Sequence, residues 1–540
     1  MILLLLFASC SGKAPTQPLS SASSGTQIAT PPAPVQKIFR TAVVGKIASL
    51  DPSQISSFAE QYLVSNLVDT LFQRNISSGE IIPRACDRFE VSPNGLQWRI
   101  FLRKDLFWST GQRIKAKDYE VAFRRLLKPK TKAPIAKKLL YIQGAQEMLD
   151  GAFYNPENVG VSSTDLISQS EVTFTLIKPD PMFLQLLSDP ATAPIPADIY
   201  ENRQDEIFDV GNYISSGAFT VSQKSATSYS LQKNRHYRFF SAIQIDGVDF
   251  FTLSTAVEGE KMFLSGLLDQ FGYPDLSISD QTIAKLVGTG FVIFQPDLRV
   301  VFLRMNTNQS PLSQVQLRQA IAMSVEHERL ISSIAVRGEK RSESMVPGDI
   351  KFYDAPHGFY SNPTGGKELL NQLGYCDKGQ CGLLPRLTLL YPDTLSMKKI
   401  ALQFATQLKL SLATNQIQLK SMEVSPFLNA IEKSDYTMAL DELAVSPNEI
   451  FGFLHAFVSG NSLSGGYANP DYDRLIAQAL SSTNPTDMKK YYREAESLLL
   501  RDVVVIPLLT KTTPILLHQR IKGFVPNIWN NHPFETLSIK

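Results

Sequence analysis

Residue types that commonly carry catalysis are spread thinly along this chain of 540 residues. Its six histidines include no pair spaced four apart, the arrangement of two ligands in a helical zinc motif. The chain also lacks G-x-S-x-G, Walker A and G-x-G-x-x-G motifs. Asp441 and Glu442 could serve acid–base chemistry, although adjacent acids more often form a solvated edge; a Ser–His–Asp triad from distant positions stays open. The pattern favours a non-enzymatic binding protein without metal or cofactor.

The chain has four cysteines, which limits the disulfides and thiol sites that it can form. Cys376 and Cys381 lie five positions apart in the glycine-rich stretch GYCDKGQCG. An oxidising compartment would let them form a disulfide, whereas a zinc site would need a second pair of ligands, and free thiols are the remaining alternative. We therefore predict a disulfide between Cys376 and Cys381.

The first ten residues, MILLLLFASC, indicate export. An apolar run ends at Ala8, Ser9 and Cys10, the order of a bacterial lipoprotein signal in which residues 1–9 are removed and Cys10 is lipidated. Each buried lipid CH₂ contributes about 0.8 kcal/mol, so two or three acyl chains hold a protein firmly on a membrane. No Lys or Arg precedes the run, and Phe7 stands where Leu is usual. A plain cleaved signal peptide or a start site further upstream are therefore alternatives.

The segment after Cys10 predicts a flexible tether. Residues 11–36 are rich in Ser, Pro, Thr and Ala and contain no aromatic residue, so they cannot bury enough apolar surface to order themselves. We assign residues 10–37 to this linker. The remaining body has enough hydrophobic residues for two or three domains, and its net charge of +2 gives no reason to expect a nucleic-acid partner.

Within the body, predicted strands and helices alternate, which indicates an α/β fold. Alternating or continuous apolar residues mark the strands, and apolar residues three and four apart mark the helices. Strands are predicted at 43–47, 98–102, 386–390 and 503–509, and helices at 117–127, 315–331, 368–373, 400–412, 473–480 and 488–500.

Several weak motifs follow one another from about residue 43 to the C-terminus. They begin with SLDP at 49–52, F-L-R at 101–103, W-S-T-G at 108–111 and A-K-D at 116–118. SSGAFTVS with QKNRHYR, RMNTNQSPLSQVQLRQAIAMSVEHERLI, YANPDYDRLI and RDVVVIPLL come later. In this order and spacing they resemble the extracellular solute-binding family 5, the large peptide-binding proteins of ABC importers. The final WNNHPFETLSIK is similar to that of its oligopeptide-binding members.

The resemblance implies a periplasmic-binding-protein-like α/β clamp of class II, with two lobes, three domains and two crossings of the chain between lobes. An extended peptide would lie between the lobes and pair its backbone with protein strands. Arg103, Asp118 and Arg318 are expected to be structural. The implied domains are residues 38–60, 178–298 and 509–540 (domain I, lobe one), 61–177 (domain II) and 299–508 (domain III, lobe two).

Two departures from the family pattern concern the ligand. Family members hold the peptide ammonium with an Asp in W-x-A-D-Y-x-x-P, and the gap-free counterpart here is Ser446 in ALDELAVSPNEIFGFLH. The family Trp is missing near Leu443. Either a neighbouring acid replaces that Asp, or the ligand lacks an ordinary free amine, because an unpaired buried charge costs several kcal/mol. Lys46 stands where relatives often have an acid and would attract a carboxylate; local misalignment is the alternative explanation.

The sequence therefore predicts the solute-binding component of an ABC peptide importer, lipid-anchored in the bacterial periplasm and monomeric, with permease subunits as partners. One alternative keeps the fold but binds another solute, such as a muropeptide, a metal chelate or haem. Another is a surface enzyme or chaperone-like lipoprotein. The predicted ligand-binding residues are Gly45, Lys46, Ile47, Asp441, Glu442, Leu443, Ser446 and Glu449.

Overall fold

The computed structural model describes most of the chain after residue 35. The described ranges are 36–152, 156–167, 169–180, 182–272, 278–334, 337–358, 360–446, 451–482 and 484–540. The predicted signal peptide, Cys10 and nearly all of the predicted linker lie outside them, as does Glu449. Lys37–Lys540 forms one structural unit, and the following description concerns that unit.

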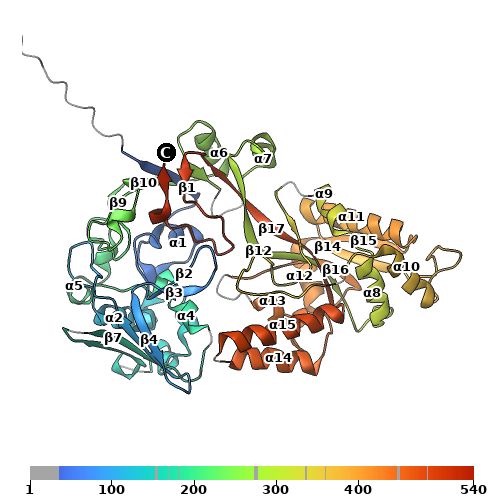
Figure 1. The fold of residues 1–540 in the computed structure, drawn as a ribbon, viewed down its shortest axis with the longest axis horizontal. Coiled ribbons are helices and arrows are strands. Elements are labelled where there is room, and N and C mark those ends of the chain that lie inside the picture. Colours follow the sequence, from blue (N-terminus) through green and yellow to red (C-terminus); the bar gives the residue numbers. More distant parts are fainter. Residues whose placement is uncertain are drawn as a thin grey trace, which may run out of the picture. The chain divides into compact units, whose positions relative to one another are not determined.

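Two long strands join the halves of an 11-stranded sheet (Figure 1). They are β12 (Val292–Met305) and β17 (Val505–Leu517), which pair antiparallel along most of their length. The sheet order is β15-β14-β16-β12-β17-β11-β1-β10-β9-β8, with β13 added beside β17. Bounds of the other strands are β1 (Ile38–Val44), β8 (Phe219–Lys224), β9 (Ser228–Lys233), β10 (Gly247–Leu253), β11 (Gln270–Phe271), β13 (Lys340–Arg341), β14 (Leu387–Pro392), β15 (Ile417–Met422) and β16 (Met438–Ala444).

Smaller sheets complete the strand inventory of the described residues. One has the order β4-β5-β7-β6 and belongs to a separate hydrophobic cluster that draws its residues from Leu71 to Ala191. Two-stranded ribbons form from β2 with β3 and from β18 with β19. Their bounds are β2 (Phe72–Arg74), β3 (Ile81–Pro83), β4 (Cys86–Val91), β5 (Gln97–Leu102), β6 (Val161–Asp165), β7 (Ser170–Thr175), β18 (Ile521–Lys522) and β19 (Ser538–Ile539).

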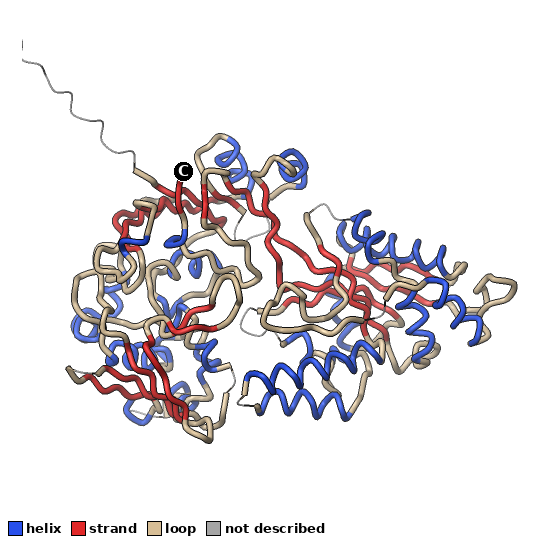
Figure 2. Tube along the Cα trace, in the orientation of Figure 1, coloured by secondary structure: helices blue, strands red, loops and turns tan. Residues whose placement is uncertain are grey.

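Figure 2 shows helices beside these sheets, and α14 and α15 also pack against each other. No helix in the described ranges is both long and apolar enough to cross a membrane. Their bounds are α1 (Phe58–Val64), α2 (Ala116–Leu126), α3 (Ala145–Leu149), α4 (Phe183–Leu186), α5 (Ala197–Arg203), α6 (Ala256–Leu264), α7 (Asp280–Leu286), α8 (Val315–Met323), α9 (His327–Ile334), α10 (Pro363–Gln372), α11 (Leu395–Ser411), α12 (Val424–Glu432), α13 (Gly452–His455), α14 (Pro470–Ser481) and α15 (Pro485–Arg501).

Several predicted elements differ from the observed ones in extent. The strand predicted at 503–509 continues to Leu517, and the helices predicted at 368–373 and 400–412 begin five residues earlier, at Pro363 and Leu395. Two further differences have a clear physical cause. The strand predicted at 43–47 ends at Val44, because Gly45 has a φ of +112°, outside the range of a regular strand. The single helix predicted at 315–331 divides into α8 and α9. At the division the Glu326 N–H donates to Gln407 Oε1 over 3.2 Å, so a side chain from α11 replaces the helical acceptor.

Two of the three residues expected to be structural, Arg318 and Asp118, are buried anchors in the fold, whereas Arg103 is partly exposed and lies 3.1 Å from the exposed Asp105. Arg318 is buried on α8 and donates to the carbonyl oxygens of Leu312 (2.7 Å) and Asp502 (2.6 Å). Asp118 is buried at the start of α2 and accepts from Trp108 Nε1 over 3.2 Å and from the Lys115 N–H over 2.9 Å. These bonds tie loops to helices and explain the motifs without a ligand.

Glu496 makes the stability of the fold depend on pH. Its buried carboxylate on α15 accepts from the N–H groups of Met345 and Val346 and from Tyr353 Oη. Burial raises the pKa of Glu496 to about 7, although these hydrogen bonds lower it. The folded state therefore holds a proton that the unfolded chain releases near pH 4.5, and stability is lost as the pH rises through 7.

We expect Glu496→Gln to gain stability relative to the wild type as the pH rises. The gain between pH 4.5 and pH 8 is on the order of 3 kcal/mol, because the amide cannot ionise. Urea unfolding at both pH values measures it. Glu494→Gln, at an exposed position of the same helix, is the control. If the difference in unfolding free energy between the wild type and Glu496→Gln were the same at both pH values, the raised pKa of Glu496 would be contradicted.

Candidate functional site

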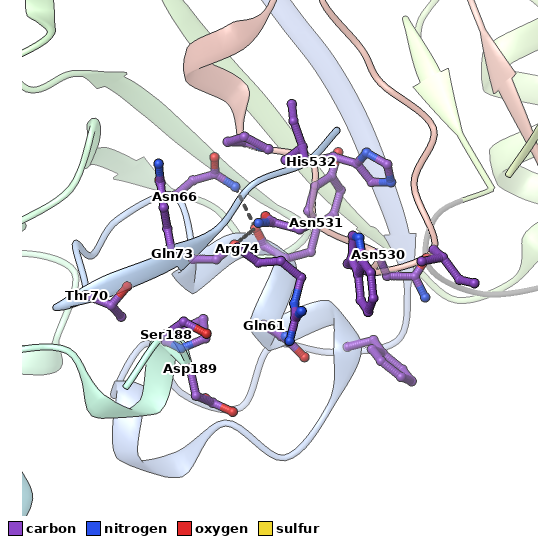
Figure 3. A pocket seen from close by; sticks show the side chains of 18 of the residues that line it. Gln61, Asn66, Thr70, Gln73, Arg74, Ser188, Asp189, Asn530, Asn531 and His532 are labelled. Carbon is purple, nitrogen blue, oxygen red and sulfur yellow. Dashed lines mark hydrogen bonds between the residues drawn. The ribbon is translucent and has the colours of Figure 1, made fainter. Parts of the chain in front are cut away.

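A cavity of about 1000 Å³ lies within the unit of Lys37–Lys540. Its walls come from four regions that are far apart in the sequence. They are α1 with the β2–β3 ribbon, residues 297–299 of β12, the end of β16 at residues 444–446, and a C-terminal segment at residues 528–536. Figure 3 shows side-chain amides of Gln61, Asn66, Gln73, Asn530 and Asn531 around it.

The start of α1 positions one wall. Ser57 caps the helix, and the buried Glu60 carboxylate accepts from the backbone N–H groups of Ala48 (3.1 Å), Ser56 (2.9 Å) and Ser57 (3.1 Å). Burial raises the pKa of Glu60, but these hydrogen bonds outweigh burial and lower it overall. The bonds lock the entry of the helix, so that Gln61, the next residue, faces the cavity.

An arginine joins the wall to the C-terminal segment. Arg84 donates to Asp69 over 2.6 Å and to Glu535 over 2.8 Å, and Tyr237 Oη donates to Glu535 over 2.8 Å. Burial lowers the pKa of Arg84, yet the two carboxylates raise it well above its usual value. Arg238 adds a second cation 3.0 Å from Asp69. The acids of this wall are therefore already neutralised by arginines.

Two strand ends present to the cavity backbone edges that pair with no strand of the described residues. The Val445 N–H donates to Leu298 O, so Val445 faces β12 while Ala444 and Ser446 face the opposite side. On that side β14 pairs with β16 only at Met438 and Ala439.

The end of β1 has the same property. The Gly45 N–H donates to Leu253 O of β10, so the backbone groups of Val44 face the other way. There β11 pairs with β1 only at Thr41. Because Val44 and Ser446 both line the cavity, two backbone edges without a strand partner among the described residues meet one space.

Of the eight predicted ligand-binding residues, the structure describes seven, and Ser446 alone of these lines the cavity. Ser446 Oγ is buried and has no hydrogen-bond partner in the described part of the chain. Ile47 is buried in a hydrophobic cluster, whereas Lys46 is exposed and does not line the cavity. Leu443 packs against a different cluster. Glu449 lies outside the described residues and stays a prediction.

The acids offered as substitutes for the family Asp are engaged in ion pairs. Asp441 lies 2.7 Å from the almost fully buried Arg304. Glu442 lies 2.5 Å from Lys511 and 3.7 Å from Arg299. Both carboxylates therefore bind protein cations, and a ligand ammonium would have to compete with Arg304 or Lys511 for them; their role as ligand residues stays a prediction.

The structure joins Cys376 and Cys381 in a disulfide, and Cys86 is buried with a free thiol. Among the described residues, no group of three or more His, Cys, Asp or Glu side chains is arranged to hold a metal ion. Besides amides, hydroxyls and backbone groups, the cavity is lined by three arginines, Lys138, His532 and four acids.

Comparisons with known proteins agree with this architecture. Residues 80–465 match the family model "Bacterial extracellular solute-binding proteins, family 5 Middle". The chain belongs to this family. Its members are solute-binding proteins rather than enzymes, and the expected α/β clamp and non-enzymatic class are confirmed.

Two relatives cover most of this family 5 protein. The dipeptide-binding protein DppE of Bacillus subtilis (strain 168) is 26% identical over 471 residues, which cover 85% of this chain and 83% of DppE. The periplasmic murein peptide-binding protein MppA of Escherichia coli (strain K12) is 24% identical over 496 residues, 89% of each chain. A solved unliganded, open form of MppA shares the fold with a TM-score of 0.83 at 24% identity, over 94% of this chain and 98% of that one.

Sequence reasoning missed most of the cavity of this family 5 protein. The wall residues Gln61, Arg74 and Trp529 lie in segments without a chemical motif, and only folding brings them together. One signal was present: the run IWNNHP at 528–533 places amides beside a Trp, a composition typical of binding surfaces.

We expect Asp441→Asn to destabilise the fold rather than to remove a ligand contact. It leaves the Arg304 guanidinium buried without its carboxylate, at a cost of about 3 kcal/mol measured by urea unfolding. Asp471→Asn, which removes an exposed ion pair with Arg474 on α14, is the matched control and should have little effect. Wild-type stability combined with lost ligand binding would contradict this role and restore Asp441 as a ligand residue.

Proposed function

We propose that this protein captures extended oligopeptides in its cavity and delivers them to an ABC permease. The observation that carries the proposal is the pair of backbone edges at Val44 and at Ala444–Ser446. They come from strands on opposite sides of the β12–β17 pair in the sheet order, and both line one cavity. An extended peptide can add to such edges as a strand, because its N–H and C=O groups point alternately to its two sides.

The chemistry of the walls suits ligands of varied sequence. Backbone pairing supplies affinity that does not depend on side chains, and amides such as Gln61, Gln73 and Asn531 both donate and accept hydrogen bonds. The names of DppE and MppA, a dipeptide-binding and a murein peptide-binding protein, support peptides as the ligand class.

The same proposal covers the rest of the protein's organisation. Hydrophobic clusters drawn from residues 71–191, from 298–529 and from 39–67 with 213–283 and 515–539 support the three expected domains. The β12–β17 pair supplies the two crossings between lobes. Lipid attachment at Cys10, a periplasmic location, a monomeric state and docking on permease subunits complete the proposal.

Backbone N-methylation of a tight-binding peptide tests the strand-addition mode. Methylating alternate backbone nitrogens should weaken binding at least tenfold, because each methyl group removes an N–H donor and adds bulk at a paired edge. Methylation at the intervening residues should have a small effect. Calorimetry on the full series measures this, with alanine replacement of each side chain as the control. A flat response along the peptide would contradict backbone pairing.

Lipid attachment is tested separately by Cys10→Ser. Expressed in a bacterium that processes lipoproteins, the wild type should sediment with membranes and Cys10→Ser should not, because it lacks the acyl chains. Cys86→Ser, which changes a buried thiol elsewhere, should stay with the membranes. Membrane association of Cys10→Ser equal to the wild type would contradict lipidation at this residue.

A second candidate ligand is a cell-wall peptide. Ser446 stands where the family resemblance implies an ammonium-binding Asp, and Asp441 and Glu442 bind protein cations instead. Calorimetry with unmodified tri- to pentapeptides beside a cell-wall tripeptide distinguishes the two candidates. Tighter binding of the cell-wall tripeptide would favour this second ligand, and tight binding of ordinary peptides would reject it.

A further inference from the structure

Arg74 is an aromatic-stacked cation on the cavity wall. It is the last residue of β2, and its guanidinium carbon lies 4.3 Å from the ring centroid of Trp529. Arg74 Nη1 donates to the Gly79 carbonyl over 2.7 Å. A guanidinium that stacks by its face presents its N–H donors at its edge, which is the geometry in which arginine binds carboxylates.

The surroundings hold this arginine in place. Gly79 has a φ of +77°, and a Cβ at this position would lie 2.4 Å from Trp529 Cζ2, so the turn between β2 and β3 admits the indole only because it carries glycine. Trp529 also stacks on Phe352, with ring centroids 5.8 Å apart and an interplanar angle of 17°. The indole is thus a rigid platform for Arg74.

Three of the four acids that line the cavity are bound by arginines of the protein. Asp69 and Glu535 accept from Arg84, and Asp297 lies 2.5 Å from Arg299. The fourth, Asp189, accepts from the Ala191 N–H over 3.0 Å. Burial lowers the pKa of Arg74 to about 10, so the guanidinium remains charged near neutral pH. A ligand carboxylate at its edge would add a charge-assisted hydrogen bond.

Uncharged donors accompany the arginine. Figure 3 shows Gln61, Gln73 and Asn531 on the same cavity as Arg74. No hydrogen bond joins their side-chain amides to any other residue of the described ranges, so their NH₂ groups can donate to a carboxylate.

A lysine-rich segment reaches the same cavity. Residues 128–138, KPKTKAPIAKK, contain five lysines and no acid, and Lys138 lines the cavity. Positive charge at the edge of a cleft raises the local concentration of anionic ligands and speeds their association. This second observation also points to a negatively charged ligand.

We propose that Arg74 is a specificity-determining residue that binds a carboxylate of the peptide, so that the protein prefers anionic peptides. The carboxylate belongs either to an acidic side chain or to the peptide C-terminus. This inference rests on the proposed peptide-binding function.

Calorimetry with matched peptides tests the proposal. Alanine pentapeptides carry Glu or Gln at each position in turn, and each is made with a free or an amidated C-terminus. On the purified full-length wild type, one of the two changes, Glu to Gln or acid to C-terminal amide, should weaken binding at least tenfold. Which change has the effect identifies the source of the carboxylate. Arg74→Gln should reduce the ratio of the two dissociation constants, with and without that carboxylate, to within twofold. The dissociation constants of the neutral peptides should stay within threefold of the wild-type values.

Arg88→Gln is the matched control. Arg88 also stacks on an aromatic ring, 3.6 Å from the centroid of Phe101, but it does not line the cavity. Its replacement should leave both ratios unchanged. Arg74→Lys keeps the charge but lacks the planar guanidinium, and it should lower the affinity ratio with and without the carboxylate at least threefold. If Arg74→Gln does not fold, this variant decides the question.

The outcomes separate the two levels of the argument. If the wild type binds the peptides but neither carboxylate affects affinity, the role of Arg74 is overturned and peptide binding stands. The same holds if the affinity ratios with and without the carboxylate are unchanged in both Arg74 variants. Failure of the wild type to bind any peptide of the series overturns the proposed function and this inference together.

Discussion

The antiparallel pairing of β12 with β17 is the constraint on which the rest of the structure depends. These two strands carry the chain between the halves of the 11-stranded sheet, so the other strands of that sheet are positioned relative to them. Their register breaks between Pro296 and Val300, where β12 advances four residues while β17 moves only from Thr512 to Thr510. Extra residues in one strand bend and twist a ladder locally, and here they occur beside the cavity.

This irregular stretch also explains why the cavity contains so few available acids. Arg299 lies within it and contacts both Asp297 and Glu442, while Lys511 on β17 reaches Glu442 from the paired strand. Charges that would be costly to bury near the crossing are paired within the protein. The acids Asp441 and Glu442, which the sequence offered as ligand residues, are therefore paired near the crossing, while the cavity itself is lined by backbone edges and side-chain amides.

Local sequence patterns predicted elements well where one physical effect dominates. The apolar spacing in α15 and in β5 reproduces their observed positions closely, because each element buries one continuous face. Patterns failed where a tertiary contact overrides local preference. The division between α8 and α9 depends on Gln407 from a distant helix, and the end of β1 depends on the positive φ of Gly45.

The sequence by itself determined the family, the α/β class and the order of the main elements, because these follow from composition, periodicity and ordered motifs. It also marked Ser446 as the position where this chain departs from the family pattern. Only the tertiary structure decided which side chains meet at the cavity and which acids are already paired. Arg74 and Trp529 are 455 positions apart, and no local pattern encodes their stacking. A contact between such distant residues depends on the packing of whole elements, which is a property of the complete fold.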